Sequence, residues 1–281
     1  MVRVVGVGDN TVDTYIHLGM MFPGGNAVNV PVLARRYGHE ASYIGCLGND
    51  GRGKLILDAL REEGVDTSHC KVLEGPNSFC EVDLVEGDRV FVGSFTGVCD
   101  RLELTGDDLD FIAGHDLAHT SIYSHVERQL PDLREASHHL SFDFSSDWTR
   151  EYLEENLPQV DLAFLSNPSQ TLAESEALLR WARGLGPEIV IITCGGEGSM
   201  AHDGERIWRQ GIVGTQVVDT LGARDAFAAR FLVQYLSGSP VGEAMEEAAR
   251  SAAETCGYYG AFGHGVPIGN DYVRSKSKRE Q

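Results

Sequence analysis

Short apolar runs that alternate with helical patterns constrain the fold of this chain more than any other feature. The strand-like runs cover residues 2–8, 41–48, 116–123, 139–144, 162–166 and 188–195. Stretches with helical periodicity, such as 26–38, 53–64 and 169–186, lie between them. Apolar strands separated by helices form parallel sheets that are covered on both faces. The pattern therefore predicts an α/β fold with a three-layer, doubly wound, mostly parallel sheet.

The length of the chain, 281 residues, suits one large α/β domain or two small ones. No repeat and no low-complexity segment interrupts it, so we expect a single domain over residues 1–281. No apolar run reaches the roughly 18 residues that cross a bilayer, and no secretory leader follows Met1. We expect the protein to be cytoplasmic.

The charge of the chain is strongly negative. Lys and Arg number 23 against 42 Asp and Glu, which gives a net charge of -19. Such a field repels nucleic acid and anionic membranes, so we expect neither of them as a partner. Six cysteines lie far apart without a C-x-x-C pair, and this spacing favours small core residues in a reducing compartment over disulfides or a zinc site.

One segment, residues 78–97, interrupts the alternation of strands and helices. Its apolar and polar residues alternate on both sides of an "EGD" turn, which is typical of a hairpin with one wet face. A hairpin inserted into a parallel α/β fold suits a lid over a site at the carboxyl ends of the strands. An edge extension and a dimer contact are the alternatives. We place the lid segments at approximately 10–22 and 77–98.

Several glycine-rich loops could hold an anion or a sugar. "GVGDNT" (6–11) lacks the third glycine of a dinucleotide fingerprint, and "GNDGRGKL" (48–55) has Leu55 where a P-loop needs Ser or Thr. The loops "NPSQ" (167–170) and "TCGGEGS" (193–199) end two strands at one edge of the sheet, and the second is a natural seat for a nucleotide phosphate. The candidate nucleotide-binding residues are Asn167, Thr193, Gly195, Gly196 and Gly198, and the alternative for 193–199 is a simple hairpin turn.

The stretch "PGGNAVNV" (23–30) is more informative, because two glycines open a helix that carries Asn26 and Asn29 on one face. Amide side chains both donate and accept, which suits sugar hydroxyls. The plain alternative makes Asn26 a helix N-cap and leaves Asn29 unexplained. The candidate substrate-binding residues are Asp9, Asp13, Gly24, Gly25, Asn26 and Asn29.

The stretch "DTLGARDAF" (219–227) places small residues and an acid at the start of an amphipathic helix. Main-chain N–H groups at a helix start point outward, and the helix dipole makes this end an anion site. Asp225 could merely cap the helix. An acid beside an anion site could also take the proton of an attacking hydroxyl during phosphoryl transfer. His115 and His119, by contrast, have no third ligand and are interpreted as surface or core histidines.

The motifs "GGNAVNV", "GCLGNDGRG" and "DTLGARDAF" together resemble the two signature regions of the ribokinase-like (PfkB) carbohydrate kinases, over nearly the whole chain. Within that family, "GDNTVDTY", "GDRVF", "HTSIYSH" and "FDFSSDW" most resemble fructoselysine 6-kinases. The resemblance implies a ribokinase-like fold, ATP and Mg²⁺ as cofactors, and a hairpin lid that is often used in dimer contacts. It also implies Asp225 as the catalytic base, with an anion hole formed by Gly222, Ala223 and Arg224.

This chain departs from the family pattern at three positions. Arg224 replaces the second glycine of Gly-Ala-Gly-Asp, Arg230 stands where a glycine is usual, and Gln170 replaces a glutamate that organises Mg²⁺. An arginine at 224 is tolerated if the backbone there is helical and is strained by about 1 kcal/mol or more if φ is positive. The sequence assigns no metal ligand.

Three hypotheses follow. The first is an ATP-dependent kinase that phosphorylates the 6-hydroxyl of fructoselysine or a related fructosamine. The second is a sugar- or nucleotide-binding relative in which Arg224 has impaired catalysis. The third is a kinase of the same family for another ketose or a nucleoside.

Overall fold

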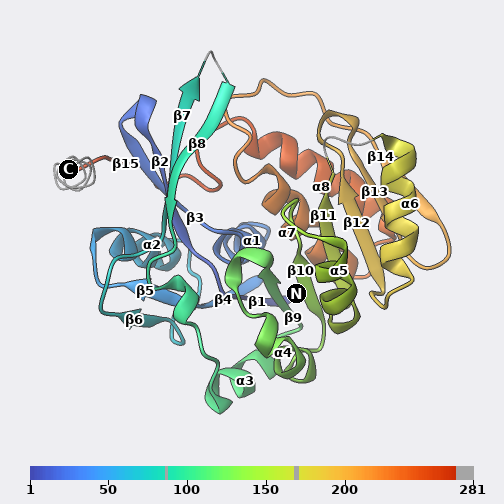
Figure 1. The fold of residues 1–281 in the computed structure, drawn as a ribbon, viewed down its shortest axis with the longest axis horizontal. Helices are drawn as coiled ribbons and strands as arrows, with labels where there is room; N and C mark the ends of the chain where they lie inside the picture. The colour runs from blue at the N-terminus through green and yellow to red at the C-terminus, as the bar shows by residue number, and fades with distance from the viewer. Residues whose placement is uncertain (86–87, 168–170, 270–281) are drawn as a thin grey trace.

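The computed structural model describes residues 1–85, 88–167 and 171–269. Within these residues the largest sheet has eight strands, of which six are parallel and two form an antiparallel edge. In spatial order the strands are β14 (Ile207–Gln210), β13 (Ser199–His202), β12 (Ile189–Thr193), β11 (Leu162–Ser166), β10 (Leu140–Asp143), β9 (Leu117–Ser121), β1 (Arg3–Val7) and β4 (Glu40–Ile44). The predicted mostly parallel sheet is confirmed (Figure 1).

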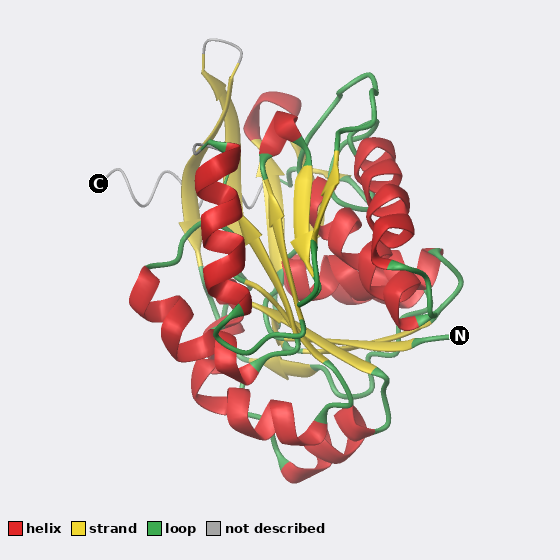
Figure 2. Ribbon diagram, turned by 90° about the vertical axis from the view of Figure 1, so that its right-hand side faces the viewer, coloured by secondary structure: helices red, strands yellow, loops and turns green. Residues whose placement is uncertain are grey.

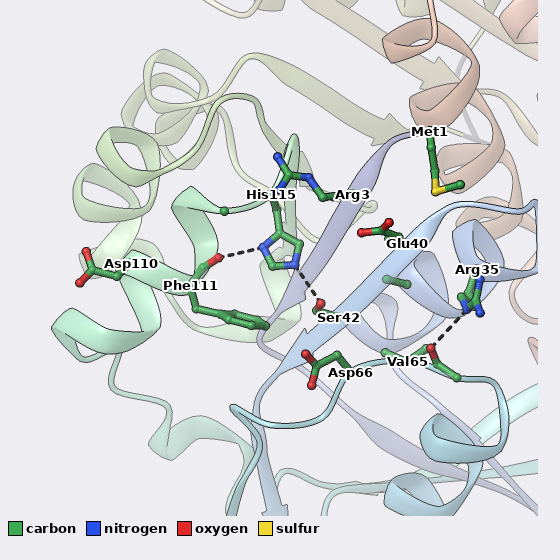
Figure 3. A pocket seen from close by; sticks show the side chains of 13 residues that line it. Met1, Arg3, Arg35, Glu40, Ser42, Val65, Asp66, Asp110, Phe111 and His115 are labelled. Atoms are coloured by element: carbon green, nitrogen blue, oxygen red, sulfur yellow. Dashed lines mark hydrogen bonds between the residues drawn. The ribbon is translucent and has the colours of Figure 1, made fainter.

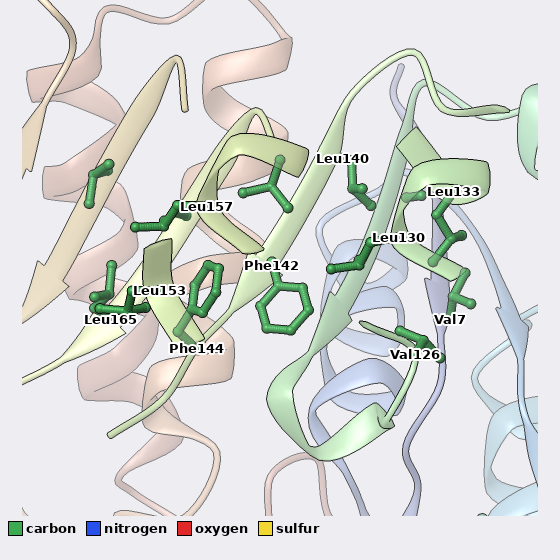
Figure 4. Close-up of a cluster of buried hydrophobic side chains, with 14 of the residues drawn as sticks. Val7, Val126, Leu130, Leu133, Leu140, Phe142, Phe144, Leu153, Leu157 and Leu165 are labelled. Carbon is green, nitrogen blue, oxygen red and sulfur yellow. The ribbon is translucent and has the colours of Figure 1, made fainter. Parts of the chain in front are cut away.

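Helices cover both faces of this sheet (Figure 2). Side chains alternate along a strand, so Leu162 and Phe164 of β11 pack on one face while Ala163 and Leu165 pack on the other. The first face is covered by α1 (Asn26–Arg36), α7 (Ala223–Leu236) and α8 (Val241–Thr255). The second is covered by α3 (Gly106–Ala113), α4 (Leu130–Ala136), α5 (Arg150–Asn156) and α6 (Leu172–Arg183). Figure 4 shows the apolar cluster on this second face.

A smaller sheet stands beside the main one. Its spatial order is β15 (Val266–Pro267), β3 (Met20–Gly24), β2 (Thr11–Tyr15), β7 (Phe79–Val85) and β8 (Asp88–Phe95). The predicted hairpin is confirmed as the antiparallel pair β7 and β8, which extends past the neighbouring strands in Figure 1. Helix α2 (Gly51–Glu62) packs with α1 and residues of the small sheet, and β5 (Cys46–Gly48) pairs with β6 (Lys71–Leu73).

Some predicted boundaries are wrong. The run 41–48 forms two strands, β4 and β5, in different sheets. Strand β1 ends at Val7, opposite Ile44, so the residues after Ile44 have no partner in the main sheet and pair with β6 instead. The helix expected within 219–227 begins at Ala223, so that Asp225 lies within its first turn. All six cysteines are free thiols, as the spacing predicted. Across the described residues, no helix is both long enough and apolar enough to cross a membrane.

The order of the strands brings several loops to one edge. Strand β1 connects to β4 on one side, and the chain then continues through β9 on the other, so the connections diverge between β1 and β9. In open α/β sheets, ligands bind outside the carboxyl ends of the strands at such a point. Asp9 follows β1, Asp143 ends β10, and the start of α7 lies at the same edge.

Candidate active site

Helix α7 begins directly after a glycine. Gly222 is its N-cap residue with φ of 77°, and no side chain caps the helix. A Cβ atom at Gly222 would lie 2.5 Å from Cα of Ala261, so only glycine fits there. No side chain caps the N–H groups of Arg224 and Asp225 in the first turn, which suits an anion, whereas the N–H of Ala223 donates to the carbonyl of Thr220 at 3.3 Å.

The carboxylate of Asp225 does not cap its helix. Its Oδ1 accepts a hydrogen bond from Nδ2 of Asn26 at 2.8 Å, and its Oδ2 accepts one from Nδ2 of Asn29 at 2.5 Å. Both donors lie in the first turn of α1, which follows Gly25 with φ of 109°. Asn26 is thus the first residue of α1, and its interpretation as an N-cap is wrong. Two helix starts converge on one carboxylate.

A second carboxylate, that of Asp143, shares this arrangement. Its Oδ2 accepts from Nδ2 of Asn26 at 3.0 Å, and its Oδ1 accepts from the main-chain N–H of Ser145 at 2.7 Å. Burial raises the pKa of Asp143 to about 6. The positive charge of Arg224 lowers this pKa, but it offsets the effect of burial only in part. Asp143 was not among the predicted site residues.

The two asparagines of α1 have different bonding capacity left. Both donors of Asn26 are directed to carboxylates, and its Oδ1 contacts Nε2 of His119 at 2.8 Å. The Oδ1 atom of Asn29 is buried and accepts no hydrogen bond from the described part of the chain. Asn29 therefore has an acceptor available for a ligand, whereas Asn26 is fully engaged by the protein.

Asp9 is also engaged by the protein. Its oxygens accept from the main-chain N–H groups of Asn26 and Ala27, at 2.7 and 3.2 Å, and from the hydroxyls of Ser121 and Ser124, at 2.8 and 2.9 Å. Burial raises its pKa in spite of these four donors. The contacts favour a role in holding the start of α1 over the sugar contact expected from the sequence.

Asp13 lies where a ligand at the start of α1 would meet it. It belongs to β2, is 5% exposed, and pairs with Phe22 of β3. A Cβ atom at Gly24 would lie 2.5 Å from Oδ2 of Asp13, so this carboxylate lies directly over the "GGN" turn. Asp13 therefore lies against Gly24, in the turn that precedes α1.

The candidate nucleotide-binding residues gather at the ends of β11 and β12. Asn167 donates from its main chain to the carbonyl of Thr193 at 2.9 Å and from Nδ2 to Oγ of Ser175 at 3.2 Å. Beyond β12, the chain turns through Gly195 and Gly198, both with positive φ, and Gly196 has open space at its Cβ position. Gln170, which replaces the glutamate of the family pattern, lies outside the described residues.

Both unusual arginines are accommodated. Arg224 is helical, so the strain that a positive φ would cause does not arise. Its Nη1 donates to Oγ of Ser145 at 3.1 Å. Partial burial lowers the pKa of Arg224, and the carboxylates of Asp143 and Asp225 outweigh this effect and raise it. Arg230 donates to Glu247 at 3.0 Å and lies over the ring of Tyr37.

A separate cavity of about 910 Å³ lies at the amino ends of β1 and β4 (Figure 3). His115 lines it and contacts Oγ of Ser42 at 2.8 Å. Its two arginines have partners within the protein, since Arg3 pairs with Asp116 and Arg35 donates to the carbonyl of Gly64. This cavity shares no residue with the cluster around Asp225. We place the active site at the carboxyl edge instead.

No metal centre is preformed in the parts of the chain that the structure describes, where no three His, Cys, Asp or Glu side chains group together as ligands would. The cluster instead offers two carboxylates, amide donors and a helix start. Such a site can bind a polyol, accept a proton and stabilise a phosphate.

Comparisons with known proteins agree with this chemistry. The pattern of the pfkB family carbohydrate kinases matches residues 9–267. Fructosamine kinase FrlD of Bacillus subtilis (strain 168) is 42% identical over 269 residues, which cover 94% of this chain and 94% of that protein. Fructoselysine 6-kinase of Escherichia coli (strain K12) is 37% identical over 265 residues, which cover 93% of this chain and 100% of that protein. The structure of ribokinase from Arabidopsis thaliana with ribose and ATP superposes with a TM-score of 0.79 at 21% identity, covering 93% of this chain and 94% of that one.

Proposed function

The chain belongs to the pfkB family of carbohydrate kinases, and from that premise we propose that it transfers the γ-phosphate of ATP to the 6-hydroxyl of fructoselysine or a related fructosamine. The observation that carries the proposal is the placement of Asp225. Its carboxylate is fixed by Asn26 and Asn29 at the start of α7, where no side chain caps the main-chain N–H groups of the helix. A base and an anion site therefore meet at one point.

In the proposed reaction, the carboxylate of Asp225 removes the proton of the primary hydroxyl. The resulting oxygen attacks the γ-phosphorus, a C–O–P bond forms, and the bond between the γ-phosphorus and the β-γ bridging oxygen breaks to release ADP. The N–H groups of Gly222, Ala223, Arg224 and Asp225 stabilise the charge that develops on the phosphoryl oxygens.

On the sugar side, we assign substrate contacts to Asp13, Gly24, Gly25 and Asn29. The buried, unpartnered Oδ1 of Asn29 supports this assignment, because it can accept a hydrogen bond from a sugar hydroxyl. We reassign Asp9 and Asn26 to holding the site, since their side chains are engaged by the protein. The two relatives named for fructosamine and fructoselysine support this substrate class.

On the nucleotide side, we assign ATP to Asn167, Thr193, Gly195, Gly196 and Gly198. Mg²⁺ would be bound together with ATP, as is usual for this ion in phosphoryl-transfer sites. When bound, it neutralises phosphate charge. The described residues fit this role, since they supply the neighbouring carboxylates of Asp143 and Asp225 and no closed cage of their own.

We propose that residues 1–281 act as one domain and that the small sheet is its lid, formed by segments near 10–22 and 77–98. Lid closure excludes water that would otherwise hydrolyse ATP. Phe91, Val92 and Phe95 of β8 are exposed apolar residues, and they support a homodimer joined through the lid.

The test is ADP release in the presence of fructoselysine, with the product identified as the 6-phosphate by mass spectrometry. Asp225→Asn keeps the size of the side chain and removes the base, so we expect kcat to fall by at least about 100-fold. Asp58→Asn, on the exposed face of α2, is the matched control. Equal rates for wild type and Asp225→Asn would remove the assigned base.

A second candidate function, binding without turnover, is favoured by the position of Arg224 in the proposed anion hole. Its guanidinium would then occupy the space of the γ-phosphate. Sugar binding by an inactive wild type, with turnover gained in Arg224→Gly, would select this candidate. A thermal-shift screen of ketoses, glycated amino acids and nucleosides separates both candidates from a kinase for another substrate.

A further inference from the structure

His119 lies in the middle of β9, in the main sheet, and none of its surface is exposed. Both of its ring nitrogens have partners. Nδ1 lies 2.7 Å from Oγ of Ser141 on the neighbouring strand β10, and Nε2 lies 2.8 Å from Oδ1 of Asn26. Asn26, to which we assigned the role of holding Asp225, is therefore itself bonded to His119.

The donor and the acceptor of each hydrogen bond that links Ser141, His119 and Asn26 can be assigned. Asn26 donates from Nδ2 to the carboxylates of Asp143 and Asp225, so its Oδ1 must be turned toward His119 and can only accept. Nε2 of His119 must therefore carry a proton. Burial lowers the pKa of His119 to about 3, so the ring is neutral and its Nδ1 accepts from the hydroxyl of Ser141.

Resting on the proposed kinase function, we propose that His119 is a positioning residue for the catalytic base. Its Nε2–H group holds the amide of Asn26 in the one orientation that donates to both carboxylates. If the amide turned over, its oxygen would face Asp225 and Asp143, and like partial charges would repel each other. Loss of the donor at Nε2 also leaves Oδ1 of Asn26 buried without a partner, which favours rotation of the side chain.

Two amide replacements that differ in length by one methylene group separate this role from simple packing. The amide of glutamine can place a donor near the position of Nε2, whereas the shorter asparagine reaches only the region of Nδ1, toward Ser141. We expect His119→Asn to lower kcat at least about tenfold, with the KM for ATP changed less than about twofold, because the nucleotide residues are on other strands. We expect His119→Gln to retain most of the activity.

Thermal unfolding and circular dichroism of both variants show whether each is folded. Comparable kcat values for folded His119→Asn and wild type would overturn the proposal, as would a loss in His119→Gln that equals the loss in His119→Asn. A wild type that turns over none of the sugars tested would instead refute the proposed function, so the two failures are distinguishable.

A measurement on the wild-type protein needs neither turnover nor a variant. Long-range ¹H–¹⁵N correlation spectra report which ring nitrogen of a histidine is protonated. We expect the neutral Nε2–H form of His119 between about pH 5 and pH 8. The Nδ1–H form, or a doubly protonated ring at neutral pH, would overturn the proposal even if both variants failed to fold.

Discussion

Asp143 and Asp225 accept hydrogen bonds from the same nitrogen, Nδ2 of Asn26, at 3.0 and 2.8 Å. One carboxylate ends a central strand and the other begins a helix, more than 80 residues later in the chain. Burial raises the pKa of Asp143, and the nearby charge of Asp225 adds to this effect. This pair therefore has consequences for stability as well as for catalysis.

The first prediction concerns the pH dependence of stability. The pKa of Asp143 is raised from 3.8 to about 6 in the folded protein, so ionisation is less favourable there than in the unfolded chain. The contribution of Asp143 to the free energy of unfolding is therefore greatest when its carboxyl group is protonated, and it is lost as the pH rises from about 4 to about 6. Asp143→Asn removes this loss. Relative to wild type, we expect its free energy of unfolding to gain about 2–3 kcal/mol between pH 4 and pH 7.

Urea denaturation at several pH values measures this difference. Asp58→Asn, at an exposed site on α2, should track wild type across the same range. A difference between Asp143→Asn and wild type that does not change with pH would contradict the raised pKa.

The second prediction concerns Arg224. Its guanidinium donates to Ser145, two residues after β10, and no side chain caps the start of α7. We therefore expect it to bind the phosphates of ATP, so Arg224→Ala should raise the KM for ATP about tenfold, the effect of losing one charge-assisted hydrogen bond. Steady-state kinetics with varied ATP measures this change.

Arg230→Ala is the control for that experiment, because its guanidinium bonds Glu247 and stacks on Tyr37. It should lower the melting temperature and leave the KM for ATP unchanged. A higher kcat in Arg224→Gly than in wild type would show that the arginine blocks phosphate.

The third prediction separates Asp9 from Asp13, which the sequence placed in the same pocket. Asp9 accepts from four donors, so Asp9→Asn should lower the free energy of unfolding by about 2 kcal/mol. Asp13→Asn should instead raise the KM for the sugar about tenfold, since its carboxylate lies over the turn before α1. Urea denaturation and steady-state kinetics with varied sugar, on both variants, distinguish a structural role from a substrate contact. The reverse pattern would show that Asp9, and not Asp13, contacts the substrate.

Local patterns in the sequence predicted much of this molecule. Apolar periodicity located the parallel strands, and the alternating segment after residue 78 predicted the hairpin, because both signals depend on neighbours in the chain. The small residues before Asp225 likewise predicted a helix start. Each of these features depends on residues that lie close together in the sequence.

The partners within the site were not predictable in this way. His119 and Asp143 matter because β9 and β10 are adjacent and end beside α1, which is a property of strand order. Asn26 and Asn29 look equivalent in the sequence, yet contacts from distant strands engage one and leave an acceptor on the other. Asp143 could have been flagged by its position at the end of a predicted strand, and nothing local distinguishes His119 from His115.

The last prediction concerns Gly222, whose φ of 77° sets the direction in which α7 leaves the loop. An added Cβ atom would lie 2.5 Å from both Cα and Cβ of Ala261, and the backbone of Ala261 cannot retreat as a flexible side chain would. We expect Gly222→Ala to lower the free energy of unfolding by about 1–3 kcal/mol. Because any relief moves the start of α7, it should also lower kcat more than it changes the KM for the sugar. Gly214→Ala, at a position with open space and no positive φ, is the matched control and should resemble wild type in both measurements. A Gly222→Ala variant with wild-type stability and kcat would mean that the helix start tolerates displacement, and the anion site would then not depend on its exact backbone.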